Sequence, residues 1–245
     1  MKKSNKAKNS RFLWLLAGGA AVLIALLALP ALGGNGQTPA APTQTTPTVN
    51  AAQPLPTEPP EIGIGQGLVI ERIGGYSGRY MEDGSNDIVQ DVLMLILRNE
   101  ADRDLQLARI RIEYPDFTAE LEVTNLAAGE RAVLLERNRC AYTQDAYLNI
   151  TAGNVVFFPE KMDLMPDVLE LGGKAGVVEA TNVSGTDLAG PIYIYYKNSA
   201  GDLLYGGITY RVLIEGGIPA GETVRIPAGH YAPEDCRFVM VTTAG

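Results

Sequence analysis

One strand pattern occurs twice in this chain, and this repetition limits the possible folds more than any other feature. In the first copy, Ile110, Ile112 and Tyr114 alternate with polar residues, and the same alternation returns over residues 192–196. An apolar side chain at every second position is typical of a β-strand that buries one face. Beyond the N-terminal apolar run, no stretch has helical periodicity. The sequence therefore predicts an all-β fold.

The repetition extends beyond this strand. Two stretches of 27 residues, 127–153 and 219–245, share Ala-Gly-Glu near the start and Thr-Ala-Gly at the end. Five residues recur in the same order, with Asn99, Asp104, Leu105, Gly129 and Glu130 matching Asn182, Asp187, Leu188, Gly221 and Glu222. The spacing grows from 83 to 92 residues, because the second copy holds an additional turn and strand, "KNSAGDLLYGGITY". We expect a hairpin there, around residues 200–202.

These patterns predict two tandem antiparallel β-sandwiches, immunoglobulin-like in the broad sense, over residues 61–158 and 165–245. The nearly continuous apolar run "VLMLILRN" is consistent with a central sandwich strand. Each copy would end on its own last strand, which explains the shared ending.

The N-terminal residues have a different character. Residues 1–11 carry five positive charges and no acid, and residues 12–32 contain no charge. As a helix, the 21-residue run would span roughly 31 Å, close to the hydrocarbon thickness of a bilayer. We expect a transmembrane helix with a cytoplasmic basic tail and everything after Leu32 outside the cell membrane. The competing interpretation is a signal peptide cleaved after Ala31.

Composition separates a linker from an acidic body. Residues 33–60 are rich in Pro, Thr, Ala and Gln and lack a large apolar cluster, so we expect a disordered spacer. Beyond residue 11 the chain holds 15 basic and 28 acidic side chains, a net charge of −13. An acidic body repels nucleic acid, which we exclude as a partner.

Two segments carry a resemblance to a known family. The stretch "VEATNVSGTDLAGPIYIYYKNSAGDLLYG", followed by "IPAGET", resembles the FxLYD-type extracellular sandwich. The pairing of "GGYSGRYMEDGS" (74–85) with "YYKN…GGITYR" (195–211) is similar to that in uncharacterised single-pass surface proteins of Gram-positive anaerobes. The resemblance implies a fold and a location but no activity.

Chemical candidates are few. Cys140 and Cys236 are the only cysteines, and a disulfide between them would link the two repeats; two separate thiols are the alternative. His230 is the sole histidine, which limits catalytic triads and zinc sites. The acidic loop with Glu82, Asp83 and Asp87 is a weak calcium candidate, since it lacks the spacing of a known cage. We expect no cofactor.

Tyrosines supply the one specific surface candidate. If Ile192 and Ile194 face the core, Tyr193 and Tyr195 face outward, and Tyr205 or Tyr210 of the additional strand could lie beside them. Exposed tyrosines on a sheet are common in recognition surfaces, although they are also ordinary cross-strand packing.

We therefore expect a membrane-anchored extracellular module without catalytic activity that binds a protein or glycan at the cell envelope. The alternatives are an extracellular hydrolase using the loop carboxylates, and a purely structural spacer. A sandwich fold does not imply catalysis by itself.

Overall fold

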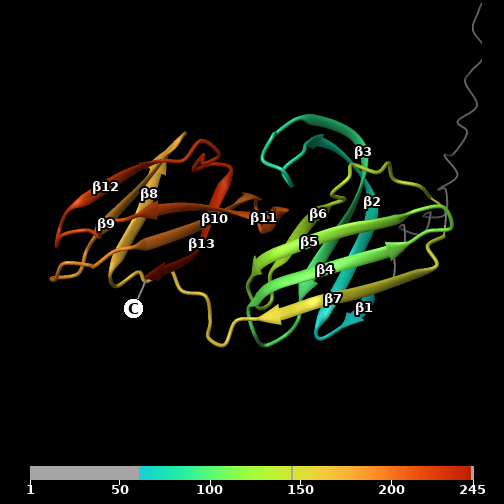
Figure 1. The fold of residues 1–245 in the computed structure, drawn as a ribbon, viewed down its shortest axis with the longest axis horizontal. Helices are drawn as coiled ribbons and strands as arrows, with labels where there is room; N and C mark the ends of the chain where they lie inside the picture. Colours follow the sequence, from blue (N-terminus) through green and yellow to red (C-terminus); the bar gives the residue numbers. More distant parts are fainter. Residues whose placement is uncertain (1–60, 145, 244–245) are drawn as a thin grey trace, which may run out of the picture. The chain divides into compact units, whose positions relative to one another are not determined.

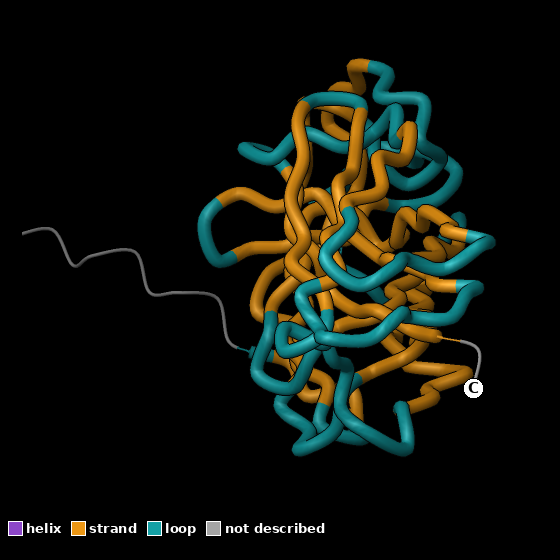
Figure 2. The backbone as a smooth tube through the Cα atoms, turned by 90° about the vertical axis from the view of Figure 1, so that its left-hand side faces the viewer, coloured by secondary structure: helices purple, strands orange, loops and turns teal. Residues whose placement is uncertain are grey.

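The computed structural model describes residues 61–144 and 146–243, which form thirteen strands and no helix (Figures 1 and 2). The described part of the chain therefore contains no helix that could span a bilayer. The expected transmembrane helix (12–32) and linker (33–60) lie outside the described residues. The strands are β1 (Ile62–Gly65), β2 (Leu68–Arg79), β3 (Ile88–Asn99), β4 (Leu105–Glu113), β5 (Thr118–Leu126), β6 (Arg131–Leu135), β7 (Asn149–Phe157), β8 (Leu169–Lys174), β9 (Val177–Asn182), β10 (Ile192–Ala200), β11 (Leu203–Ile214), β12 (Thr223–Pro227) and β13 (Cys236–Thr243).

The strands form three sheets, and this confirms the all-β prediction. A seven-stranded sheet has the order β1-β2-β3-β6-β11-β10-β13, and two three-stranded sheets have the orders β12-β9-β8 and β5-β4-β7. All pairings are antiparallel except that of β6 with β11, which is parallel and spans three residue pairs.

The strand order repeats along the chain. In the first half, β2-β3-β6 is one set of paired strands and β5-β4-β7 the other; in the second half the sets are β8-β9-β12 and β11-β10-β13. Each half has its own apolar core. Leu95, Ile110 and Leu121 belong to the first, and Val178, Ile194 and Val241 to the second.

Two buried asparagines make the same contacts in the two halves. The Nδ2 of Asn99 donates to the carbonyls of Arg103 and Leu126, and the Nδ2 of Asn182 donates to those of Thr186 and Ile218. Each side chain is fully buried, and its Oδ1 accepts an amide two residues later.

The glycines and aspartates of the repeat complete this arrangement. Gly129 donates its amide to the Asn99 carbonyl, as Gly221 does to that of Asn182. Asp104 accepts the Ala128 amide, and Asp187 accepts the Ala220 amide. The short repeated motifs are therefore hydrogen-bonded turns, which explains why so few letters recur.

The additional hairpin of the second copy is where the structure departs from two independent sandwiches. The hairpin is present, with β10 and β11 joined at Gly201 and Asp202, as the sequence predicts. Its tip pairs with β6, and Asp202 forms an ion pair with Arg131 at 3.2 Å. One sheet consequently runs through both halves.

Strand β3 explains the continuous apolar run. Its alternate residues Leu93 and Leu95 belong to the first core, whereas Val92 and Met94 belong to a smaller cluster on the opposite face. That smaller cluster also contacts Tyr205 of β11. Because both faces of β3 are covered, its sequence needs apolar side chains at consecutive positions.

We predict that Asn99→Ala and Asn182→Ala each destabilise the protein by about 2–4 kcal/mol, because each change leaves one buried and one partly buried carbonyl without its donor. The two variants should lose similar amounts of stability, since Asn99 and Asn182 make matching hydrogen bonds. Chemical denaturation measures them, with exposed Asn149→Ala as the control, expected within about 0.5 kcal/mol of the unsubstituted protein. A negligible loss at either buried site would contradict the structural role assigned here.

Candidate functional site

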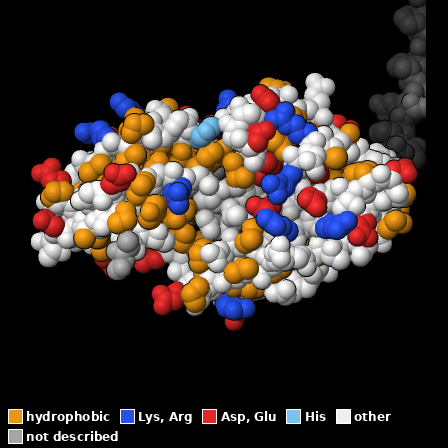
Figure 3. All heavy atoms as spheres, in the orientation of Figure 1, with side chains coloured by type: hydrophobic (Ala, Val, Ile, Leu, Met, Phe, Trp, Pro, Cys, Tyr) orange, Lys and Arg blue, Asp and Glu red, His pale blue; other side chains and the backbone are white. Residues whose placement is uncertain are grey.

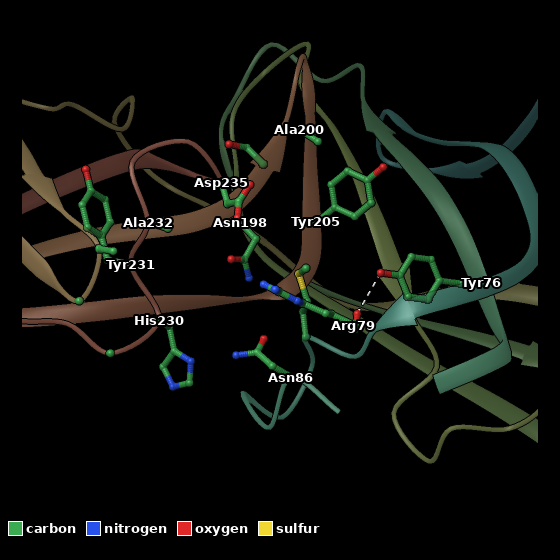
Figure 4. Close-up of a pocket in the computed structure, with 15 residues that line it drawn as sticks. Tyr76, Arg79, Asn86, Asn198, Ala200, Tyr205, His230, Tyr231, Ala232 and Asp235 are labelled. Carbon is green, nitrogen blue, oxygen red and sulfur yellow. Dashed lines mark hydrogen bonds between the residues drawn. The ribbon is translucent and has the colours of Figure 1, made fainter. Parts of the chain in front are cut away.

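A cavity of about 500 Å³ lies where the β10–β11 hairpin meets the end of β2 (Figure 4). Its volume is in the range of sites that bind small molecules. Five segments form its walls, including the β8–β9 turn and the loop before β13. Its principal polar and aromatic side chains are Tyr76, Arg79, Asn86, Asn198, Tyr205, His230, Tyr231 and Asp235.

The first wall is the connection between β2 and β3. The buried Tyr80 anchors it, with its hydroxyl 2.9 Å from the carbonyl oxygens of Glu136 and Arg137. The Arg139 guanidinium lies over the Tyr80 ring and forms ion pairs with Asp83 and Asp87 at 2.6 and 3.0 Å. These contacts fix the connection before any ligand arrives.

The facing wall is the loop over residues 228–235. The Tyr231 amide donates to the Ala228 carbonyl, and the Gly176 amide donates to the Tyr231 carbonyl. The Tyr231 ring packs edge-on against Tyr196, while His230 stacks on Tyr210 with 4.6 Å between ring centroids. Aromatic packing therefore positions the histidine at the cavity.

Glu82 binds backbone amides of two strands. Its carboxylate accepts the amides of Leu135 and Gly207 at 2.8 Å. The carbonyl of the same Gly207 accepts a hydrogen bond from the Lys197 ammonium at 2.9 Å. A side chain on Gly207 would overlap with the Glu122 carbonyl oxygen, so only glycine allows this close approach of β11 to β5.

Lys197 is fully buried. Its Nζ also donates to the carbonyls of Thr124 and Ile208, both at 2.9 Å. Burial lowers the pKa of Lys197 to about 7, while the charges of Glu82 and Glu130 act to raise it. Burial likewise raises the pKa of Glu82, opposed by its backbone hydrogen bonds and by Lys197.

The three carboxylates of the acidic loop already have protein partners, and the calcium interpretation stays a prediction. Hydrogen bonds from Ser85, and then the contact with Arg139, lower the pKa of Asp83 to about 2. Asp87 pairs with the same guanidinium, and Glu82 turns toward Lys197 and the backbone amides. Asp83 and Asp87 therefore converge on one guanidinium while Glu82 binds elsewhere, and the described residues include no group of three metal-ligating side chains.

The four candidate tyrosines fall into two locations. Tyr193 and Tyr195 are half-buried on β10 and lie opposite Leu213 and Arg211, whose guanidinium covers the Tyr193 ring. Tyr205 lines the cavity, and Tyr210 stacks on Tyr196. Neither is paired with Tyr193 or Tyr195 across the ladder.

A bulge separates the two locations. Tyr196 pairs with Tyr210, yet Asn198 pairs with Tyr205, so residues 206–209 of β11 protrude opposite Lys197. The simple alternation used to place the tyrosines does not account for these extra residues.

Cys140 and Cys236 are separate free thiols, so no disulfide links the repeats. Burial raises the pKa of both, which keeps them in the unreactive protonated form. The Cys236 thiol donates to the His230 carbonyl at 3.4 Å and thereby helps to hold the loop over residues 228–235.

Several cavity residues were not candidates from sequence reasoning, namely Tyr76, Arg79, Asn86, Asn198 and Asp235. The two segments quoted for the resemblance, 74–85 and 195–211, are the part of the sequence that could have indicated some of these residues. These segments are far apart in the sequence, and both contribute side chains to the cavity in Figure 4.

We predict a pH dependence of stability that Lys197→Met removes. The folded pKa of about 7 lies below the ordinary value of about 10.4, so the unfolded chain binds more protons between these values. Stability should rise with pH across this window, by at most about 1.4 kcal/mol per pH unit. Glu82 acts oppositely above about pH 4.3, because its pKa is raised and its contribution is lost as pH rises.

Denaturant titrations from about pH 7 to about pH 9.5 measure the difference between the two proteins. The methionine variant should be less stable throughout, and the gap should widen with pH. Parallel curves for the two proteins would show that Lys197 has the same pKa in the folded and unfolded chains.

No protein-family model matches the chain, and no curated protein or solved structure matches it either. The likeness to FxLYD-type sandwiches and to surface proteins of Gram-positive anaerobes stays an expectation that rests on the quoted motifs. The function is therefore inferred from the sequence and from the geometry of the cavity.

Proposed function

We propose that this protein is a membrane-anchored extracellular module that binds a protein or glycan at the cell envelope without catalysing a reaction. Residues 12–32 would anchor it, residues 33–60 would act as a spacer, and the β-rich part would carry the binding site. Binding is the function that the cavity supports best.

We further propose that the β-rich part consists of two duplicated immunoglobulin-like sandwiches, over residues 61–158 and 165–245. The repeated strand order and the matching contacts of Asn99 and Asn182 support this proposal. The additional hairpin then links the two copies through β6 and β11.

The observation that carries the binding function is the cavity with its uncommitted polar side chains. Arg79, Asn86 and Asp235 line it, and their side chains make no hydrogen bond or ion pair within residues 61–144 and 146–243. A passive spacer has no need of a preformed cavity, whereas a binding module does.

The hydrolase alternative has less support. Its proposed carboxylates, Glu82, Asp83 and Asp87, are held by backbone amides or by Arg139. The face displayed in Figure 3 carries interspersed acidic and basic side chains, which favours neither nucleic acid nor another polyanion as a partner.

The topology predicts the outcome of limited proteolysis. Protease added to intact cells stripped of their wall should digest residues 61–245, while residues 1–11 stay protected. The measurement is immunoblotting with tags at either end. Recovery of the whole β-rich part in the culture medium, beginning near Leu32, would establish cleavage and contradict the anchor.

The binding function predicts retention on the cell envelope. The full chain, purified in detergent, should cosediment in a saturable way with envelope fragments from the cells that make it. The double variant Tyr193→Ala/Tyr195→Ala tests whether the tyrosines of β10 contribute to this binding, since their side chains lie outside the cavity. We expect it to sediment like the unsubstituted protein. Failure of the unsubstituted protein to sediment would favour the spacer.

A further inference from the structure

Two charged side chains of the cavity, Arg79 and Asp235, have no ion-pair partner among the described residues. Eight described arginines form ion pairs, and Arg103 and Arg211 lie over aromatic rings. Among the arginines that the structure describes, Arg72 and Arg79 make neither kind of contact, and only Arg79 lines the cavity. An unpaired guanidinium at a concave site is available to a ligand.

The opposite charge is available as well. Asp235 contributes a carboxylate without an ion-pair partner among the described residues, and the Tyr205 hydroxyl forms no hydrogen bond there. A ligand with a single charge would satisfy one of the two ions and be repelled by the other. Hydroxyl groups donate and accept, so an uncharged polyhydroxy ligand satisfies both.

The cavity also presents aromatic surface. Tyr76 and Tyr205 lie on one side of it and His230 on the other (Figure 4). The Tyr76 hydroxyl is occupied, since it donates to the Arg79 carbonyl at 2.9 Å, which fixes the ring against the end of β2. Rings held in this way offer apolar faces together with polar edges. The carbon-bound hydrogens and hydroxyls of a sugar ring match such a surface.

The exposed apolar side chains that a protein partner could cover lie outside the cavity. The exposed large apolar residues of the described chain, among them Ile88, Leu148 and Val183, do not line it. A cavity of about 500 Å³ with small residues such as Gly176 and Ala200 on its walls has instead the size for a compact ligand.

We propose that this cavity binds a neutral mono- or disaccharide unit of an envelope glycan, with Arg79 donating to its oxygens, Asp235 accepting from its hydroxyls, and Tyr205 flanking the ring. This inference rests on the proposed function and selects a glycan from its two classes of partner. The connection fixed by Arg139 and the loop before β13 form the site in advance, so binding costs little ordering of the protein.

The test uses the full chain in a detergent without a sugar headgroup. The probes are cellobiose, maltose and N,N′-diacetylchitobiose, with digalacturonate as the acidic counterpart, and saturation-transfer NMR titration gives each Kd. We expect at least one neutral disaccharide to bind with a Kd of about 1 mM or tighter, and digalacturonate to bind more weakly.

Arg79→Ala should raise the Kd for the neutral sugar by about tenfold, which corresponds to the loss of one hydrogen bond from a charged group. Arg72→Ala is the matched control, because Arg72 is also an exposed, unpaired arginine of β2 but lies outside the cavity. It should leave the Kd unchanged. Tyr205→Phe, which keeps the ring, provides a second variant should Arg79→Ala disturb folding, and it should also weaken binding.

Two results would overturn the inference. One is that no neutral disaccharide binds at about 20 mM; the other is that binding persists unchanged in the Arg79 and Tyr205 variants. If the protein still sediments with envelope fragments, and saccharides do not displace it, the partner is a protein and only the glycan assignment fails. If it does not sediment at all, the proposed binding function fails.

Discussion

The N–H and the C=O of Gly207 bind buried charges of opposite sign, and the union of the two halves depends on these two contacts. Glu82 accepts its amide, and Lys197 donates to its carbonyl. A buried charge is costly unless hydrogen bonds compensate it, and here backbone groups from β5, β6 and β11 supply them. Removal of either side chain would leave its backbone partners without a hydrogen bond and would remove a favourable charge near the other ion, so the two half-structures are coupled at this point.

This coupling also creates the cavity. The residues added in the second copy extend the β10–β11 hairpin to β6, and the bulge opposite Lys197 supplies the Gly207 and Ile208 carbonyls that bind its ammonium. The same hairpin places Asn198 and Tyr205 near Tyr76 and Arg79 of the first half. A plain duplication would lack this wall. The difference between the repeats, more than their similarity, therefore positions the candidate site.

The sequence predicts the residues of the site only in part. Tyr205 was a candidate because it is aromatic and lies in a strand, and His230 was noted because it is the sole histidine; both line the cavity. Arg79 and Asp235 could not be selected, because their distinguishing property is the absence of a partner. The sequence contains many charges, and only their positions in space show which ones are paired.

The sequence by itself determined the local structure. Alternation at residues 110–114 and 192–196 dictates strands, because side chains on successive residues point to opposite faces. Recurring asparagines favour matching turns, since Asn99 and Asn182 each bind an amide two residues later. The hydrogen bonds of the recurring Asp and Gly residues join these turns to distant ones. Only the tertiary structure decided the parallel pairing of β6 with β11, the burial of Lys197 and the separation of the tyrosines. These features join segments that are distant in sequence, and no local pattern encodes a contact whose energy depends on the burial of both partners.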